Sequence, residues 1–225
     1  MISVRPLLYV ALGLLMVVSI IELSFISAMV GWLHSTASGT FSFRWHDQTY
    51  NLKGEPANFI TDQGHTSNGA AGTAFVLIGL GGIIALFLRN RQNPGKFSRF
   101  IYNFWLVTNV LSLLLVLAAL IYTFVVTNQN DQNIVPGFAA QLKEGEKYPV
   151  DSWTPQTWFS GLLDLDLASS DERSDIEHHL RVIWGWQYNL IPFFIIHLAE
   201  TGLALWDAMQ RRKEPLPAYA PTKHD

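Results

Sequence analysis

The sequence lacks cysteine entirely and has few charged residues. Without thiols, the chain has no disulfide framework, no thiol nucleophile, no cysteine-ligated zinc and no c-type haem attachment. Charged residues make up 15% of the chain, whereas an ordinary soluble domain contains about a quarter. The net charge of −3 at pH 7 reflects no excess of basic residues, so nucleic acid is not an expected partner. Asn-x-Ser/Thr sequences are absent too, and no N-glycosylation is expected.

Hydrophobic residues, by contrast, form 49% of the chain, and the mean hydropathy is +0.20. A helix that crosses a bilayer needs about 20 mainly apolar residues, and four stretches reach that length. They cover about 6–30, 70–88, 100–126 and 184–206. In lipid the backbone must satisfy its own hydrogen bonds, as a helix or a closed barrel does. None of the four stretches alternates between apolar and polar residues, so each is predicted to be a helix. The first stretch has an apolar run of about 25 residues, longer than a signal-peptide core, and we interpret it as a retained signal anchor.

The predicted fold class is therefore an all-α membrane protein. It is a four-transmembrane-helix bundle with a small β-hairpin and short helices in the outer loops. Residues 1–210 form a single predicted domain. Residues 211–225 contain three prolines and are predicted to be a disordered cytoplasmic tail.

The basic residues predict how this bundle is oriented. The link between the second and third spans carries four basic residues and no acid, the tail carries four more, and Arg5 precedes the first span. Residues 127–183 contain ten acidic residues against four basic ones. Because basic loops stay in the cytoplasm, both termini are expected to be cytoplasmic and the two larger loops outside or lumenal. The plasma membrane and an endomembrane both remain open as the location.

The first outer loop carries signals for a hairpin. Phe41, Phe43 and Trp45 alternate along the chain and share one face, and Asp47 suits the turn that follows them. This pattern predicts a β-hairpin over about 41–52. Residues 62–69 are rich in turn formers and are expected to lead into the second span as a loop. A further turn is expected at 93–95, where the sequence is Asn-Pro-Gly.

The second outer loop carries two helix-start signals. Thr154 followed by Pro155 predicts a helix through about Leu163, with Trp158, Phe159 and Leu162 facing either the bilayer surface or the hairpin. Ser169 and Glu172 have the spacing of a capping box. A second helix is therefore expected to begin there and to run unbroken into the fourth span.

Ionisable residues inside predicted spans are costly to bury and are candidates for function. Three occur, namely Glu22, His197 and Glu200. With about 3.6 residues per turn, the fourth span presents one narrow polar stripe, which is expected to face the bundle interior. The stripe consists of Asn189, Phe193, His197, Glu200, Ala204 and Asp207, and the opposite face of Tyr188, Ile191, Ile195 and Leu198. The helical rise also predicts that Glu22, Asn109 and His197 can meet near the membrane midplane.

Two interpretations of these residues stay open. In the first, Glu22, His197 and Glu200 are catalytic groups that act as acid and base in a dry pocket, as isomerisation, cyclisation or epoxide opening requires. Asn109, Asn189 and Phe193 line that pocket. In the second, Glu22 is protonated or hydrogen-bonded to His197, and the polar groups hold the helices together. No cofactor is expected in either case.

A second polar set lies in the outer loops and consists of Asp62, His65, Asp175, His178 and His179. Asp175 and His179 are four residues apart on a predicted helix and share a face, so a divalent ion such as zinc is one use for the set. A solvated acidic loop explains the same residues, and no metal site is predicted.

Small residues mark one side of the second span, where Gly72, Phe75, Gly79 and Gly82 align. Such a face allows close helix approach, either within the bundle or in a homodimer.

Four spans, cytoplasmic termini and a hairpin in the first outer loop resemble the claudin-type arrangement, including its fungal cell-cortex relatives. The resemblance covers the topology of residues 6–206. Claudin-like proteins pair two cysteines beside a Gly-Leu-Trp motif, whereas this chain has no cysteine and carries Gly31-Trp32-Leu33 at the membrane edge. No residue role is therefore carried over. Segments 62–72 and 151–158 are also similar to four-span integral membrane proteins of filamentous fungi, which implies no activity.

The predicted function is that of a tetraspan organiser or structural component of a membrane, acting with membrane-protein partners or as a homo-oligomer in the lipid bilayer. The alternative is a small membrane-embedded enzyme that acts on a lipid-like, terpenoid or polyketide substrate through an intramembrane Glu/His pair. A transporter or channel subunit is disfavoured, because the sequence shows no inverted repeat and no pair of broken helices. A cavity lined by Glu22, Asn109 and His197 would favour the enzyme, whereas tight packing of these groups would favour the organiser.

Overall fold

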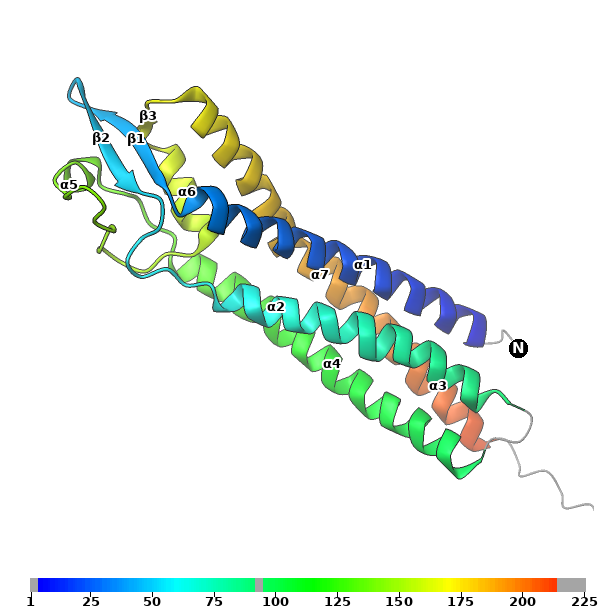
Figure 1. Cartoon of the computed structure of the whole chain (residues 1–225). Helices are drawn as coiled ribbons and strands as arrows, with labels where there is room; N and C mark the ends of the chain where they lie inside the picture. Colours follow the sequence, from blue (N-terminus) through cyan, green and yellow to red (C-terminus); the bar gives the residue numbers. More distant parts are fainter. Residues whose placement is uncertain (1–3, 92–94, 214–225) are drawn as a thin grey trace, which may run out of the picture.

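A computed structural model describes residues 4–91 and 95–213 of the chain. Within these residues, four long helical segments form a bundle that carries a small folded cap at one end (Figure 1). Each segment is long and apolar enough to cross a membrane, which confirms the predicted number of helices. The segments are α1 (Val4–Trp32) continued by the π-helical turn η1 (Leu33–Ala37), then α2 (Asp62–Thr73) with η2 (Ala74–Leu80) and α3 (Gly81–Arg89), α4 (Lys96–Gln129), and α7 (Ser170–Lys213).

The helices extend beyond the predicted spans, and two of these extensions change the interpretation of a segment. The second helix begins at Asp62 instead of residue 70, so the segment expected to be a loop is the first two turns of α2. Gln63 and Ser67 are buried there, and the Trp186 indole of α7 donates a hydrogen bond to Ser67 Oγ at 2.9 Å. Packing against α7 therefore outweighs the weak helix propensity of this segment. At the other end, α7 continues to Lys213, three residues past the predicted domain boundary. Residues 214–225 of the predicted tail and residues 93 and 94 of the predicted turn lie outside the described residues.

The cap consists of residues 38–61 and 130–169. It contains β1 (Thr40–Trp45), β2 (Gln48–Lys53), the short β3 (Asp166–Leu167), α5 (Pro136–Ala139) and α6 (Pro155–Leu163). The antiparallel pairing of β1 with β2 confirms the hairpin. Its two-residue turn is His46-Asp47, with φ of 48° and 61°, as the hairpin turn with two left-handed residues requires. The third strand, which the sequence did not predict, makes the sheet order β2-β1-β3 and joins the two loops.

Both helix starts predicted in the second loop are confirmed. The Thr154 hydroxyl accepts a hydrogen bond from the backbone of Thr157 at 3.3 Å, and Pro155 occupies the first position of α6. The Ser169 hydroxyl accepts from the backbone of Glu172 at 3.3 Å, and α7 then runs into the fourth span past Pro192.

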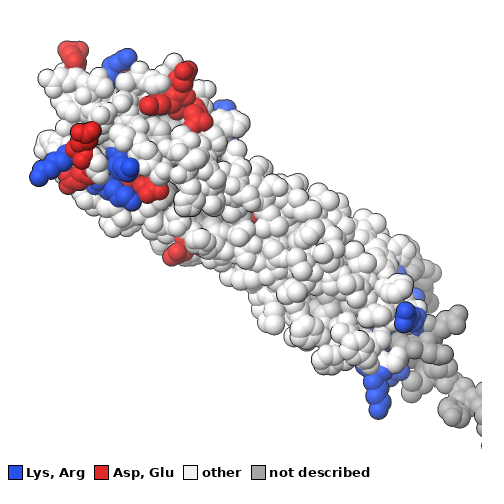
Figure 2. Space-filling model, viewed as in Figure 1, with Lys and Arg blue, Asp and Glu red and all other residues white. Residues whose placement is uncertain are grey.

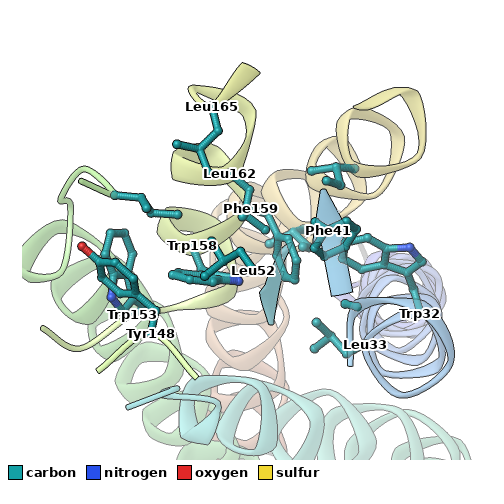
Figure 3. Packing of buried hydrophobic residues seen from close by; sticks show 14 of the residues in the cluster. Trp32, Leu33, Phe41, Leu52, Tyr148, Trp153, Trp158, Phe159, Leu162 and Leu165 are labelled. Atoms are coloured by element: carbon teal, nitrogen blue, oxygen red, sulfur yellow. The ribbon is translucent and has the colours of Figure 1, made fainter. Parts of the chain in front are cut away.

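An aromatic core fills the cap and extends to the ends of α1 and α7 (Figure 3). The rings of Trp153 and Trp158 meet edge to face with centroids 5.2 Å apart. The Trp158 indole also donates to the Gly54 carbonyl at 2.7 Å, which ties the second loop to the first. Phe159 and Leu162 are buried in the same core. The apolar side of α6 therefore faces the hairpin, not the bilayer surface.

Charged side chains gather at the two ends of the molecule and leave the visible face of the shaft almost uncharged (Figure 2). The cap end carries acidic and basic residues, and the other end carries basic residues only on this face. An apolar shaft between two polar ends is the surface expected of a protein that lies across a bilayer.

Candidate functional site

The polar stripe on α7 faces the interior of the bundle, as predicted. Phe193, His197, Glu200, Ala204 and Asp207 are buried and Asn189 is half-buried, whereas Tyr188, Ile191, Ile195 and Leu198 are exposed. The helical period of apolar and polar residues therefore determines which face of α7 meets the other helices.

Glu22 of α1 is fully buried and is paired with Asn189 of α7. The Asn189 amide donates to Glu22 Oε2 at 2.8 Å and lies 3.4 Å from the Val18 carbonyl oxygen. The second carboxyl oxygen, Oε1, has no hydrogen-bond partner among the described residues. This pair joins α1 to α7 in the half of the bundle nearer the cap.

A second buried group joins α4 to α7 farther from the cap. The Asn109 amide donates to both carboxyl oxygens of Glu200, at 2.9 and 2.8 Å. The Thr201 hydroxyl donates to Asn109 Oδ1 at 2.6 Å, so the amide uses its donor and its acceptor sides. All three residues are buried. Interhelical hydrogen bonds of this kind stabilise membrane bundles by about 0.6 kcal/mol each on average.

His197 lies fully buried between these two pairs along α7, and neither of its ring nitrogens has a hydrogen-bond partner within residues 4–91 and 95–213. Its ring is nearly parallel to that of Phe193, with centroids 6.3 Å apart.

The structure does not join Glu22, Asn109 and His197 to one another by hydrogen bonds. The helical rise explains why: Asn189 precedes His197 by eight residues, or about 12 Å along the axis. The packing register of α1 against α7 places Glu22 beside Asn189, and local sequence patterns do not encode that register.

A third group, which the sequence analysis missed, lies at the end of the bundle opposite the cap. The Tyr102 hydroxyl of α4 donates to Asp207 Oδ2 at 2.7 Å, and Arg211 Nε donates to the same oxygen. Arg211 Nη2 also donates to Asn90 Oδ1 at 2.7 Å, at the end of α3. Arg5 of α1 lies 3.9 Å from Asp207 Oδ1. The i, i+4 spacing of Asp207 and Arg211 was the available signal for this group.

Two of the polar residues considered for metal binding, Asp175 and His179, interact with Trp32. The Trp32 indole donates to Asp175 Oδ2 at 2.7 Å, and the His179 ring stacks on Trp32 with centroids 4.5 Å apart. His179 Nδ1 lies 3.2 Å from Asp175 Oδ1. No group of three His, Asp or Glu side chains close enough to hold a metal occurs in the described part of the chain, and Asp62 and His65 do not join this set.

The glycine face of the second helix packs inside the bundle at two positions. A Cβ added to Gly79 would lie 2.4 Å from Met16 Cγ of α1, and one added to Gly82 would lie 2.8 Å from Trp105 Nε1 of α4. Gly72 has no neighbour within 4 Å of such an atom. These contacts support packing within the bundle for Gly79 and Gly82.

None of Glu22, Asn109, His197 and Glu200 lines any of four pockets on the described part of the chain. One of about 260 Å³ lies where α4, α6 and α7 meet, next to the buried Gln187 and Thr127. Two others lie between α4 and α7 at the end opposite the cap. Each of these four side chains is at most 1% exposed and is enclosed by its neighbours.

No family model, no curated protein and no solved structure matches this chain.

Proposed function

We propose that this chain is a tetraspan organiser: a multi-pass membrane protein that uses its cap to bind neighbouring membrane proteins or further copies of itself. In this proposal both termini are cytoplasmic and the cap is outside or lumenal, in the claudin-like arrangement described above. Four helices long and apolar enough to cross a membrane support the membrane assignment, and the basic end opposite the cap supports the orientation (Figure 2).

The observation that carries this proposal is that the two outer loops fold together around one core. Besides the β1–β3 pairing, Trp153 of the second loop exchanges backbone hydrogen bonds with the first: its amide donates to the Asn58 carbonyl at 2.9 Å, and its carbonyl accepts from Ile60 at 2.8 Å. The Trp32–Asp175 hydrogen bond then fastens α1 to α7 just below the cap. A platform held this firmly suits binding, because little conformational entropy is lost when a partner docks.

The cap also presents apolar side chains beyond the bundle. Val135 and Phe138, beside and within α5, have 55% and 38% of their surface exposed. Exposed apolar residues clustered on a folded surface are a frequent feature of protein–protein contacts.

The enzyme remains the second candidate, because one observation favours it. The imidazole of His197 and one carboxyl oxygen of Glu22 are buried without hydrogen-bond partners in the described residues, and such groups in a native protein require an explanation. In this alternative they act, with Glu200, as acid and base on a lipid-like, terpenoid or polyketide substrate.

A complementation experiment separates the two candidates. A deletion strain receives wild-type protein, Glu22→Gln, His197→Phe, Val135→Asp or the matched cap control Gln141→Asp, each at equal protein level. Phenylalanine keeps the shape of His197 and its stacking on Phe193, and because neither ring nitrogen has a partner in the described residues, stability is expected to change by less than about 1 kcal/mol.

The organiser predicts that Glu22→Gln, His197→Phe and Gln141→Asp restore the strain, whereas Val135→Asp fails and leaves a smaller complex on native gels of gently solubilised membranes. Loss of the rescue in Glu22→Gln and His197→Phe, with an altered lipid or metabolite profile and an unchanged complex, would refute the organiser and support the enzyme.

A further inference from the structure

Four arginines from three helices line one pocket at the end of the bundle opposite the cap. Arg89 ends α3, Arg99 lies in the first turns of α4, and Arg211 and Arg212 lie in the last turn of α7. The pocket has a volume of about 190 Å³, and no carboxylate is among its lining residues. Of the four arginines, only Arg211 forms an ion pair within the described residues, with the buried Asp207. The pocket therefore has a strong positive charge that the described side chains leave largely uncompensated.

An apolar groove of about 740 Å³ continues from this pocket along the shaft, between α4 and α7. The two share four lining residues, which are Asn103, Leu106, Ala208 and Arg212. Farther along, the groove is lined by Val107, Val110, Leu111, Leu205 and Met209. Val107 and Leu111 are each 60% exposed, so the groove opens on the face that the hydrocarbon of a bilayer would cover.

We propose that the pocket and groove together bind an anionic phospholipid. The phosphate-bearing headgroup lies against the arginines, and an acyl chain lies in the groove. Guanidinium groups match phosphate oxygens with paired hydrogen bonds, and basic pockets between membrane helices are a known way to hold anionic headgroups. The site lies at the other end of the molecule from the cap, and it does not depend on the organiser function.

The tendency of basic residues to lie on the cytoplasmic side of a membrane would by itself account for the number of basic residues at this end. It would not require four of them to converge on one pocket that opens into an apolar groove. Arg91 and Lys96 lie at the same end of the bundle and do not line the pocket. They therefore provide a matched control that removes the same charge without touching the site.

The test uses the full-length protein in nanodiscs of phosphatidylcholine to which phosphatidylinositol is added, with native mass spectrometry counting the bound lipid. The Arg99→Gln/Arg212→Gln variant is expected to bind phosphatidylinositol about fivefold more weakly for each arginine removed. The Arg91→Gln/Lys96→Gln variant should match wild type within about twofold, since those residues lie outside the pocket. An equal loss in both variants would show diffuse surface attraction only, and undiminished binding in the first would also overturn the proposal.

A second pair of variants tests the groove without changing any charge. Val107→Trp fills the groove, and Val10→Trp adds the same bulk at a position that is also 60% exposed but on α1, outside it. Val107→Trp is expected to weaken phosphatidylinositol binding severalfold, with Val10→Trp unchanged. If glycerophosphoinositol, which lacks acyl chains, bound as tightly as the lipid, or if Val107→Trp changed only the oligomeric state, the proposed occupant would be wrong.

Discussion

At the scale of single residues, polar side chains of α7 bind polar side chains of neighbouring helices at several depths. Asn189 meets Glu22 of α1, Glu200 meets Asn109 of α4, and Asp207 meets Tyr102 of α4 and Arg5 of α1. A shift of α7 by one helical turn along a neighbouring helix would separate these partners. The interior of the bundle would then offer the buried polar groups no other hydrogen-bond partner. The buried polar residues therefore specify the register of the bundle as well as its cohesion.

The Asn109–Glu200 pair provides the clearest test of this role. Asn109→Leu removes both donors to the buried Glu200 carboxyl group and the acceptor of Thr201. The free energy of unfolding is expected to fall by about 1–3 kcal/mol, measured by thermal or denaturant unfolding in detergent. Thr108→Val is the control on the same helix, because the Thr108 hydroxyl donates to the Phe104 carbonyl of α4 itself and not to another helix. Equal stability of the two variants would contradict a specific role for the pair.

At the scale of elements, the second helix is positioned by its glycines. Its close approach to α4 depends on Gly82, because the Trp105 indole lies where a Cβ of residue 82 would stand. The same indole donates a hydrogen bond to the Ile78 carbonyl of η2 at 3.1 Å. The side chain of one helix thus caps the backbone of the other, which requires that no Cβ stand between them. Gly72 belongs to the same sequence pattern and has no such contact.

Gly82→Ala is therefore expected to displace Trp105 and to destabilise the protein by about 1–3 kcal/mol. Gly72→Ala, with nothing within 4 Å of the added atom, should leave stability unchanged or raise it by up to about 1 kcal/mol, since alanine is the better helix former. Tryptophan fluorescence and the unfolding midpoint in detergent measure both effects. Similar midpoints for the two variants would show that the contact does not determine the packing of this helix.

At the scale of the whole molecule, the two polar ends and the apolar shaft predict a definite topology. The cap end should face the outside or a lumen and the arginine-rich end the cytoplasm. The described chain has the first residues of α1 and the last of α7 at the same end (Figure 1), as an even number of crossings requires.

Epitope tags at Met1 and Asp225 are expected to be inaccessible to antibody on intact cells, or protected in sealed vesicles if the protein lies in an endomembrane. A tag inserted after Gly145, an exposed cap residue with φ of +78° and open space within 4 Å of where a Cβ would stand, should give the opposite result. Accessibility of either terminal tag together with protection of the cap tag would reverse the orientation.

Much of this architecture was predictable from local patterns. The four helices follow from apolar runs of the length that crosses a bilayer. The inward face of α7 follows from the period of its polar residues, and the hairpin and the two helix starts follow from turn and capping residues. These features depend on residues a few positions apart in the sequence. They also depend on the preference of each apolar side chain for hydrocarbon over water, which needs no specific partner.

Other features arise only from contacts between distant segments. The helical state of Asp62–Gly69 depends on packing against α7. The third strand and the aromatic core of the cap join the two outer loops, which lie about a hundred residues apart. The pairing of Glu22 with Asn189 and not His197 depends on how far α1 slides along α7. Sequence alone determined which helices are long and apolar enough to cross a bilayer and which face of α7 turns inward, because hydrophobicity is a property of each residue. Tertiary structure decided which buried groups meet, because depth and register are properties of pairs of helices.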